Sequence, residues 1–283
     1  MIFSNCPIAT LPFVPKIKNH EIERKYSARF LGVIINDKLT WKDHTLAVKA
    51  KMSRYVGVLF KLKKFLPLSA RKNIFHSFIQ SHLHYCSLVW GLGAKSYIEP
   101  LFAEQKKAIR SLMPGYNSNY YKNGMAPCHT KAFFTEHNIP TLPSIILSNI
   151  IIFMNNLHNR KNCLPSSVAN IISPCAPKPS EINENCVSWL NMNSTLKLRN
   201  TLSFKGPLFF AKYMLEISRH CRTNKELNLP IDLFKKQTKS FVFKLQSGGR
   251  CEEWEGKNTP LYYVPGLPRI CRKNATEVSY IYE

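Results

Sequence analysis

The apolar positions near the start of the chain follow a β pattern, which changes after about forty residues. Residues 16–23 alternate around the Asn19-His20 pair, which predicts a small β-hairpin. Residues 29–35 form a continuous apolar run rich in β-branched side chains, which predicts a strand buried on both faces. Asn36-Asp37 is a turn signal, so we expect residues 39–41 to return as the partner strand.

From Asp43 onward the apolar spacing becomes helical, and Asp43 is placed to cap the first helix. Pro67 and Ser69 mark a break and a new cap, and the second helix ends near Trp90-Gly91. A third and more regular helix stops at Pro114-Gly115. The expected core positions are Val48, Met52, Val56, Leu59, Leu62 and Leu66, then Phe75, Phe78, Ile79, Cys86 and Val89, then Ile98, Leu101, Phe102, Ile109 and Leu112.

The second half of the chain mixes helical segments with polar stretches. Residues 116–140 read as a polar connection, and a helix follows from about Pro143 to about Asn159. Two further helical patterns cover residues 207–218 and 231–246, and the rest of the chain has no clear period. We therefore expect a mainly α protein with small β-hairpins at its N-terminus. The expected divisions are residues 1–44, 45–115, 116–160, 161–186 (a Pro-rich linker), 187–250 and 251–283 (a tail).

The charge balance points to a polyanionic partner. The 283 residues hold 40 Lys and Arg against 17 Asp and Glu, a formal net charge of +23. Such a field attracts nucleic acid or an anionic membrane surface. The most apolar stretch, residues 145–154, contains Ser148 and Asn149 and falls short of the roughly 20 residues that a membrane span needs. We therefore favour nucleic acid and expect no membrane partner.

The cysteines predict a reducing environment. There are nine, an odd number, and none forms a Cys-x-x-Cys pair. The first residues also lack the basic and apolar regions of a signal peptide. We expect free thiols and an intracellular location, with nucleus and cytoplasm both open.

The sequence offers no catalytic constellation. His82, His84 and Cys86 alternate, but on a helix their side chains diverge, so we predict no metal site there. Two-metal polymerase chemistry needs closely placed carboxylates, and no Asp-Asp pair occurs. The acidic residues are scattered and suit capping or helix-dipole roles. They include Asp37, Asp43, Glu99, Glu104 and Asp232.

The basic residues are the candidate binding groups. Helices with an apolar stripe and a Lys or Arg flank are what a bundle lying along a phosphate backbone would show. Taken one at a time, most of these side chains also suit an ordinary solvated surface. The residues that we expect to contact phosphates are Lys61, Lys64, Lys106, Lys107 and Arg110.

Several motifs follow one another in a consistent order along the chain. The first is Phe30-Leu-Gly-Val-Ile-Ile-Asn-Asp-Lys-Leu-Thr-Trp-Lys-Asp-His44. It resembles the segment that follows the active site in reverse transcriptases from non-LTR (LINE, jockey-like) retrotransposons. Leu83-His-Tyr-Cys-Ser-Leu-Val-Trp-Gly91 resembles a thumb-helix signature, and residues 101–110 the next helix. Residues 137–143 and 199–207 resemble later elements, so the likeness spans about residues 1–246. Phe209-Phe210 stands where the family usually has Leu-Trp.

The resemblance implies a palm-edge β remnant, a helical thumb and a helical C-terminal extension. It assigns the primer-grip position, which holds the 3′ end of the growing strand, to Phe30, Leu31, Gly32 and Val33. It implies binding of RNA or an RNA–DNA hybrid through phosphates. The family's catalytic Asp box is absent from the sequence, so we expect no polymerisation by this segment, no cofactor, and Mg²⁺ only in the palm that it lacks.

Gly32 and Trp41 each have a second interpretation. Gly32 would allow a close backbone approach at the grip, but a glycine in a strand equally suits a bulge. Trp41 suits the core better than a base-stacking role.

Two other functions compete with a reverse-transcriptase fragment. In the first, the chain is a non-enzymatic basic helical scaffold, whose surfaces bind a protein or nothing. In the second, it is a non-functional retrotransposon remnant, in which strands separated from their sheet expose edges that favour aggregation.

Overall fold

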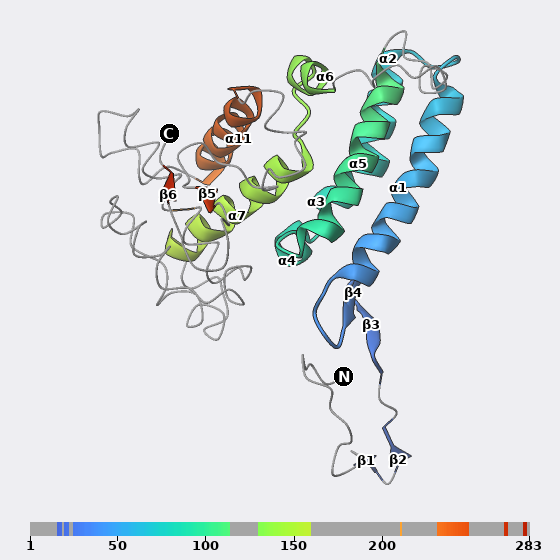
Figure 1. The fold of residues 1–283 in the computed structure, drawn as a ribbon, viewed down its shortest axis with the longest axis vertical. Helices are drawn as coiled ribbons and strands as arrows, with labels where there is room; N and C mark the ends of the chain where they lie inside the picture. The colour runs from blue at the N-terminus through green and yellow to red at the C-terminus, as the bar shows by residue number, and fades with distance from the viewer. Residues whose placement is uncertain are drawn as a thin grey trace.

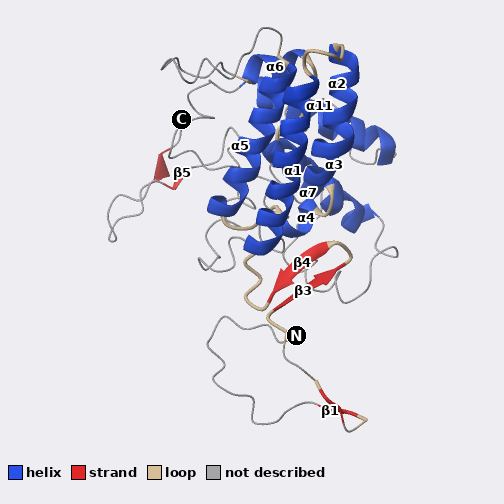
Figure 2. Ribbon diagram, turned by 90° about the vertical axis from the view of Figure 1, so that its right-hand side faces the viewer, coloured by secondary structure: helices blue, strands red, loops and turns tan. Residues whose placement is uncertain are grey.

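The protein is mainly α-helical, as the sequence predicts, with small antiparallel strand pairs at its N-terminus (Figures 1 and 2). The computed structural model describes residues 16–18, 20–22, 25–113, 130–159, 210, 231–248, 269–270 and 280–281. The linker predicted at residues 161–186 lies outside this part of the chain, as does the helix predicted at 207–218 apart from Phe210.

The first strand pair confirms the N-terminal hairpin. β1 (Lys16–Ile17) pairs antiparallel with β2 (His20–Glu21), and Ile17 lies opposite His20. His20 was predicted to lie in the turn but is part of β2, whereas Lys18 lies in the turn.

The second strand pair overturns the prediction of one strand buried on both faces. β3 (Ser27–Phe30) and β4 (Val33–Asn36) form a hairpin whose turn is Leu31 and Gly32. Their φ angles, 45° and 83°, are both left-handed, as a tight two-residue hairpin turn requires. Leu31 carries no turn signal, which is why the apolar run concealed the reversal. Gly32 is thus a turn residue rather than a bulge.

Burial in this hairpin is one-sided. All of β3 is exposed, and Val33 in β4 is the only buried residue of the two strands. The expected return strand at residues 39–41 is also wrong, because β4 pairs with β3 and residues 39–41 are a loop leading into the first helix. Asn36 closes this loop, since its Oδ1 accepts a 2.9 Å hydrogen bond from the Thr40 backbone N–H.

α1 (Lys42–Leu62) follows its predicted stripe. Val48, Met52, Val56 and Leu59 are buried, whereas Leu62 and Leu66 are only partly covered. Asp43 lies in the first turn rather than at the N-cap. The cap position is held by Trp41 with a left-handed φ of 63°, and its side chain packs against the core as expected.

The predicted second helix is broken rather than continuous. It consists of α2 (Leu68–Ile74), a π-helical segment η1 (Phe75–Gln80), α3 (Ser81–His84) and α4 (Ser87–Trp90). Pro67, not Ser69, precedes its first turn. The π turns are wider than α turns, so residues four apart stay on one face. The buried set is therefore Phe75, Ile79, Leu83 and Trp90, while the predicted core residues Phe78 and Val89 are exposed.

α5 (Lys95–Leu112) confirms its predicted core face, with Ile98, Leu101, Phe102, Ile109 and Leu112 buried. It packs side by side with α1, and the two run in the same direction from the hairpin end of the molecule (Figure 1). A short helix that the sequence did not predict, α6 (Lys131–Glu136), buries Phe133 and Phe134.

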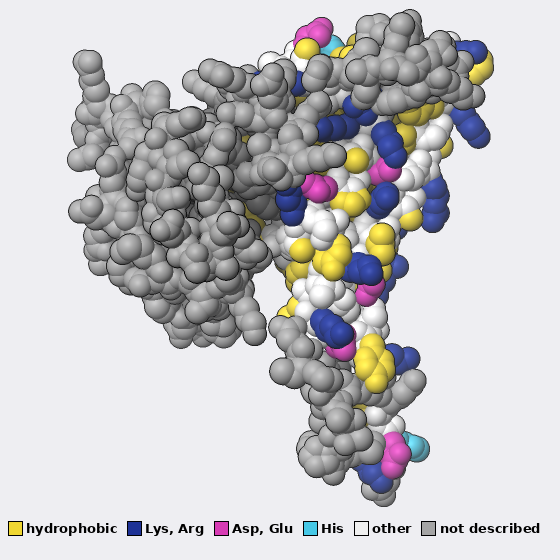
Figure 3. Space-filling view, viewed as in Figure 1, with side chains coloured by type: hydrophobic (Ala, Val, Ile, Leu, Met, Phe, Trp, Pro, Cys, Tyr) yellow, Lys and Arg dark blue, Asp and Glu magenta, His cyan; other side chains and the backbone are white. Residues whose placement is uncertain are grey.

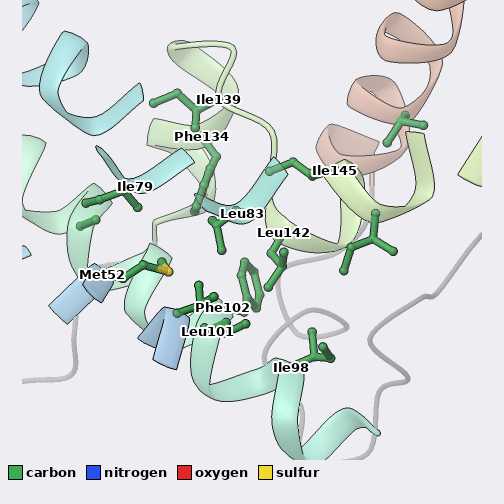
Figure 4. Packing of buried hydrophobic residues seen from close by; sticks show 14 of the residues in the cluster. Met52, Ile79, Leu83, Ile98, Leu101, Phe102, Phe134, Ile139, Leu142 and Ile145 are labelled. Carbon is green, nitrogen blue, oxygen red and sulfur yellow. The ribbon is translucent and has the colours of Figure 1, made fainter. Parts of the chain in front are cut away.

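α7 (Leu142–Asn159) and α11 (Ile231–Gly248) lie against each other and complete the helical body (Figure 1). Figure 4 shows residues of α1, η1, α5, α6 and α7 converging on one apolar core. The run at residues 145–154 is a buried helix, and no helix in the described part of the chain is long and apolar enough to cross a membrane. A last strand pair joins β5 (Arg269–Ile270) to β6 (Tyr280–Ile281).

Candidate nucleic-acid interface

The predicted primer-grip residues form the tip of the β3–β4 hairpin, which is fastened to the helical body. Phe30 and Leu31 are 64% and 74% exposed, whereas Val33 is buried. The Tyr85 hydroxyl donates a hydrogen bond to the Leu31 carbonyl. A Cβ on Gly32 would lie 3.4 Å from the Tyr85 ring, so the backbone passes close to that side chain. The tip is an anchored, partly apolar projection.

A second contact between the hairpin and the helical body involves His44. His44 is buried in the first turn of α1, and its Nδ1 accepts a hydrogen bond from the Ile34 backbone N–H at 3.3 Å. Its ring lies 5.8 Å from that of Trp90, whose Nε1 donates to the Tyr85 carbonyl at 2.9 Å. Burial, followed by the positive charges of Lys51 and Arg29, lowers the pKa of His44 from 6.5. A neutral ring is what this hydrogen bond needs.

Hydrogen bonds of Gln105 connect α5 to the start of α7. Gln105 is fully buried, and its Oε1 accepts a 2.8 Å hydrogen bond from the Leu142 backbone N–H. Its Nε2 donates to the Pro140 carbonyl at 3.0 Å. The motif segments at residues 30–44 and 83–91 therefore meet in space, as do those at 101–110 and 137–143.

The predicted phosphate contacts on α5 are partly engaged within the protein. Lys107 forms an ion pair with the buried Glu104 at 2.8 Å, and Lys106 Nζ lies 4.7 Å from the centre of the Phe102 ring. Arg110 is half-buried, and its Nε has no hydrogen-bond partner among the described residues. We call Lys106, Lys107 and Arg110 the α5 surface. On the face that Figure 3 shows, acidic side chains lie among the basic ones.

Among the described residues, no carboxylate forms an ion pair with a basic residue of α1. Lys61 and Lys64 are exposed, and neither makes an ion pair with any described residue. Lys61 is in the last turn of α1, and Lys64 follows the end of the helix. Lys51 and Arg54 also belong to α1 and were not among the predicted contacts. Residues 44–98 contain no Asp or Glu at all, a pattern that the sequence-based prediction missed. We call Lys51, Arg54, Lys61 and Lys64 the α1 surface.

A buried arginine of α2, Arg71, joins that helix to the C-terminal end of α5. Arg71 Nη1 donates a 2.9 Å hydrogen bond to the carbonyl of Ser111 at the end of α5. Burial and the charge of Arg71 lower the pKa of Lys63, which follows the end of α1. Positive charge therefore concentrates around the C-terminal end of α1, where Lys61 lies in the last turn and Lys64 follows it.

The His82, His84 and Cys86 side chains do not form a metal site, and no group of at least three His, Cys, Asp or Glu residues in the described segments could hold one. His82 instead stacks on Tyr55 at 6.1 Å, and Cys86 is a free thiol. Partial burial, followed by the positive charges of Lys239 and His76, lowers the pKa of His84.

The comparisons with known proteins leave this surface to be interpreted from its own chemistry. No family model, curated protein or solved structure matches the chain. The reverse-transcriptase resemblance thus stays a prediction.

Proposed function

We propose that this chain binds nucleic acid through its sugar–phosphate backbone, as the template-and-primer-holding part of a non-LTR retrotransposon reverse transcriptase. The partner would be RNA or an RNA–DNA hybrid, held without strong sequence preference. The carboxylate-free basic stretch at residues 44–98, which begins with most of α1, carries the proposal.

Charge and rigidity both support this role. The α1 surface offers cations that are not neutralised by described neighbours, so each can displace a counterion from a phosphate. Lys51, Arg54 and Lys61 belong to a 21-residue helix whose apolar stripe is packed in the core, which fixes the spacing of these three side chains, and Lys64 follows two residues after the helix ends. Backbone contacts position a nucleic acid but do not read its sequence.

The proposal assigns holding, not nucleotide transfer, to the described residues. Their carboxylates are dispersed, with Glu104 and Glu99 paired to lysines on α5. Positioning groups without a metal centre give binding rather than phosphodiester formation. Incubation with primer–template, Mg²⁺ and nucleotides should therefore give no extension.

The direct test is binding of a labelled RNA–DNA hybrid at two salt concentrations. We expect the affinity to fall steeply with salt, because counterion release drives phosphate binding. Replacing Lys61 and Lys64 with glutamate should weaken binding, and the salt slope should decrease by about one for each lysine that no longer meets a phosphate. Both lysines are exposed, so these variants should melt like the wild type.

A hybrid affinity that does not change with salt would contradict the proposal. Retained binding in the Lys61→Glu, Lys64→Glu variant, together with retained binding after charge reversal of the α5 surface, would favour the scaffold alternative.

A further inference from the structure

A row of aromatic rings lies beside the α1 surface, between α1 and the broken helix. The Tyr55 and Phe78 ring centres are 4.9 Å apart with 27° between their planes, and Tyr55 and His82 are 6.1 Å apart at the same angle. We call Tyr55, Phe78 and His82 the aromatic strip. Phe78 is 45% exposed, so one ring of the strip is open to solvent.

The π-helical segment explains why Phe78 is exposed. The regular spacing of the sequence placed it in the core, but the wide turns of η1 keep Phe75, Ile79 and Leu83 inward instead. Phe78 and His82 are one turn apart on the outer side, where both reach Tyr55 of α1. π-helical segments are frequent at functional sites.

Cations flank this strip. Lys51 is near enough for its charge to lower the pKa of His82, although burial contributes more. His82 is thereby favoured as a neutral aromatic ring at neutral pH. Arg54 is exposed one residue before Tyr55. Neither Lys51 nor Arg54 makes an ion pair with a described residue, and no carboxylate occurs in residues 44–98.

We propose that the aromatic strip and the neighbouring Lys51 and Arg54 bind single-stranded nucleic acid, with an unpaired base stacking on Phe78 and the adjoining phosphates meeting the two cations. Aromatic rings beside a positive groove are the means by which proteins hold single strands without reading sequence. A base has a flat π face for the exposed ring, and the phosphate supplies the negative charge that the strip's surroundings lack. This inference rests on the proposed function and extends it from duplex backbone to unpaired bases.

The test compares a ligand that has bases with one that does not. Wild-type protein and a Phe78→Leu variant would be titrated with a labelled oligouridylate of about twelve nucleotides, within the usual range of single-strand sites, and with heparin, a base-free polyanion. Leucine preserves apolar packing against Tyr55 but removes the ring. We expect oligouridylate affinity to fall about five- to hundredfold, as for loss of one stacked base, with heparin affinity unchanged.

Three further variants sharpen the result. Phe78→Tyr keeps a ring and should bind oligouridylate like the wild type. Phe65→Leu removes a ring that is 79% exposed in the turn after α1, outside the strip, and should have no effect. Lys51→Ala with Arg54→Ala should weaken both ligands, because phosphate and sulfate groups both need the cations.

Unchanged oligouridylate binding in Phe78→Leu would overturn the inference, as would an equal loss for heparin or an equal loss in Phe65→Leu. Anionic lipid vesicles that bind more tightly than oligouridylate, and lose binding in Phe78→Leu, would assign the strip to a membrane surface instead. If wild type binds the hybrid but Phe78→Leu changes nothing, only this inference fails. If wild type binds no polyanion, the proposed function fails with it.

Discussion

α1 and α5 share one core but present different surfaces to solvent. Both bury a regular apolar stripe, and both carry lysine and arginine on the other side. On α5 the cations have carboxylate neighbours, because Lys95 pairs with Glu99 at 3.3 Å and Lys107 with Glu104 at 2.8 Å. On α1 only Asp43, in the first turn, is acidic.

The difference teaches that lysines of equal formal charge are unequal binding groups. A lysine that already has a carboxylate partner must exchange that partner for a phosphate, so its net contribution to binding is small. A solvated lysine exchanges water and releases a counterion from the nucleic acid. The α1 surface should therefore dominate binding, although the sequence-based prediction named three residues of α5 and only two, Lys61 and Lys64, of the α1 surface.

The largest predicted change in free energy should come from a substitution in the core that α1 and α5 share. Met52 is fully buried in α1 among residues of η1 and α5 (Figure 4). Met52→Ala should cost about 2–5 kcal/mol of unfolding free energy by leaving a cavity. Thermal melting followed by circular dichroism measures this loss. Arg54→Ala, on the exposed side of α1, is the matched control and should change stability by less than about 0.5 kcal/mol; similar losses in both would mean that α1 is not packed as described.

The second effect separates the two surfaces directly. Lys51→Glu with Arg54→Glu changes the charge of α1 by as much as Lys106→Glu with Lys107→Glu changes that of α5. We expect the α1 variant to lose about 1–3 kcal/mol of hybrid-binding free energy and the α5 variant clearly less, since Lys107 already has a partner. Fluorescence anisotropy at fixed salt gives both values. Equal losses would remove the distinction between the surfaces.

A third and smaller effect should convert α5 toward the behaviour of α1. Glu104→Gln preserves side-chain shape but removes the charge that holds Lys107 at 2.8 Å. The freed lysine should increase hybrid affinity about two- to fivefold, in keeping with the modest energy of an ion pair whose lysine is exposed although its carboxylate is buried. Glu99→Gln, whose partner Lys95 lies at the other end of the helix, serves as the control. A gain in Glu99→Gln as large as that in Glu104→Gln would show that overall charge, not the release of Lys107, is responsible.

The helices and much of their core follow from the sequence, whereas the surfaces do not. Residues 43–62 and 95–112 repeat apolar side chains at helical spacing, and burial follows from that spacing. The turn at Leu31-Gly32 and the π segment at residues 75–80 arise from backbone conformations that residue spacing does not encode. The sequence likewise did not predict the ion pair of Lys107, because the strength of that pair depends on the burial of Glu104 beside it. Lys61 and Lys64 were predicted from the sequence as phosphate contacts, and the structure adds only that both are exposed, whereas the aromatic strip was not predicted.

The last effect concerns His44, whose pKa is lowered in part by positive charges near the first turn of α1. Its folded-state pKa lies below the ordinary 6.5 because of burial and the charges of Lys51 and Arg29. The unfolded chain therefore binds the proton more readily as the pH falls. The stability contributed by neutral His44 is present above about pH 6.5 and is lost as the pH drops through the folded-state pKa. Protonation also removes the acceptor for the Ile34 N–H, a loss of about 0.5–1.5 kcal/mol.

Melting temperature measured between about pH 7.5 and 5 should fall more steeply in the wild type than in His44→Asn, which cannot titrate there. His20→Asn, on the exposed strand β2, should keep the wild-type slope. Supplying a carboxylate through Lys51→Glu should raise the pKa of His44 and flatten the curve, because a repelling charge becomes an attracting one. If Lys51→Glu leaves the slope unchanged, the positive charge of the α1 surface does not affect the pKa of His44. The difference in charge between α1 and α5 is then confined to their exposed ends.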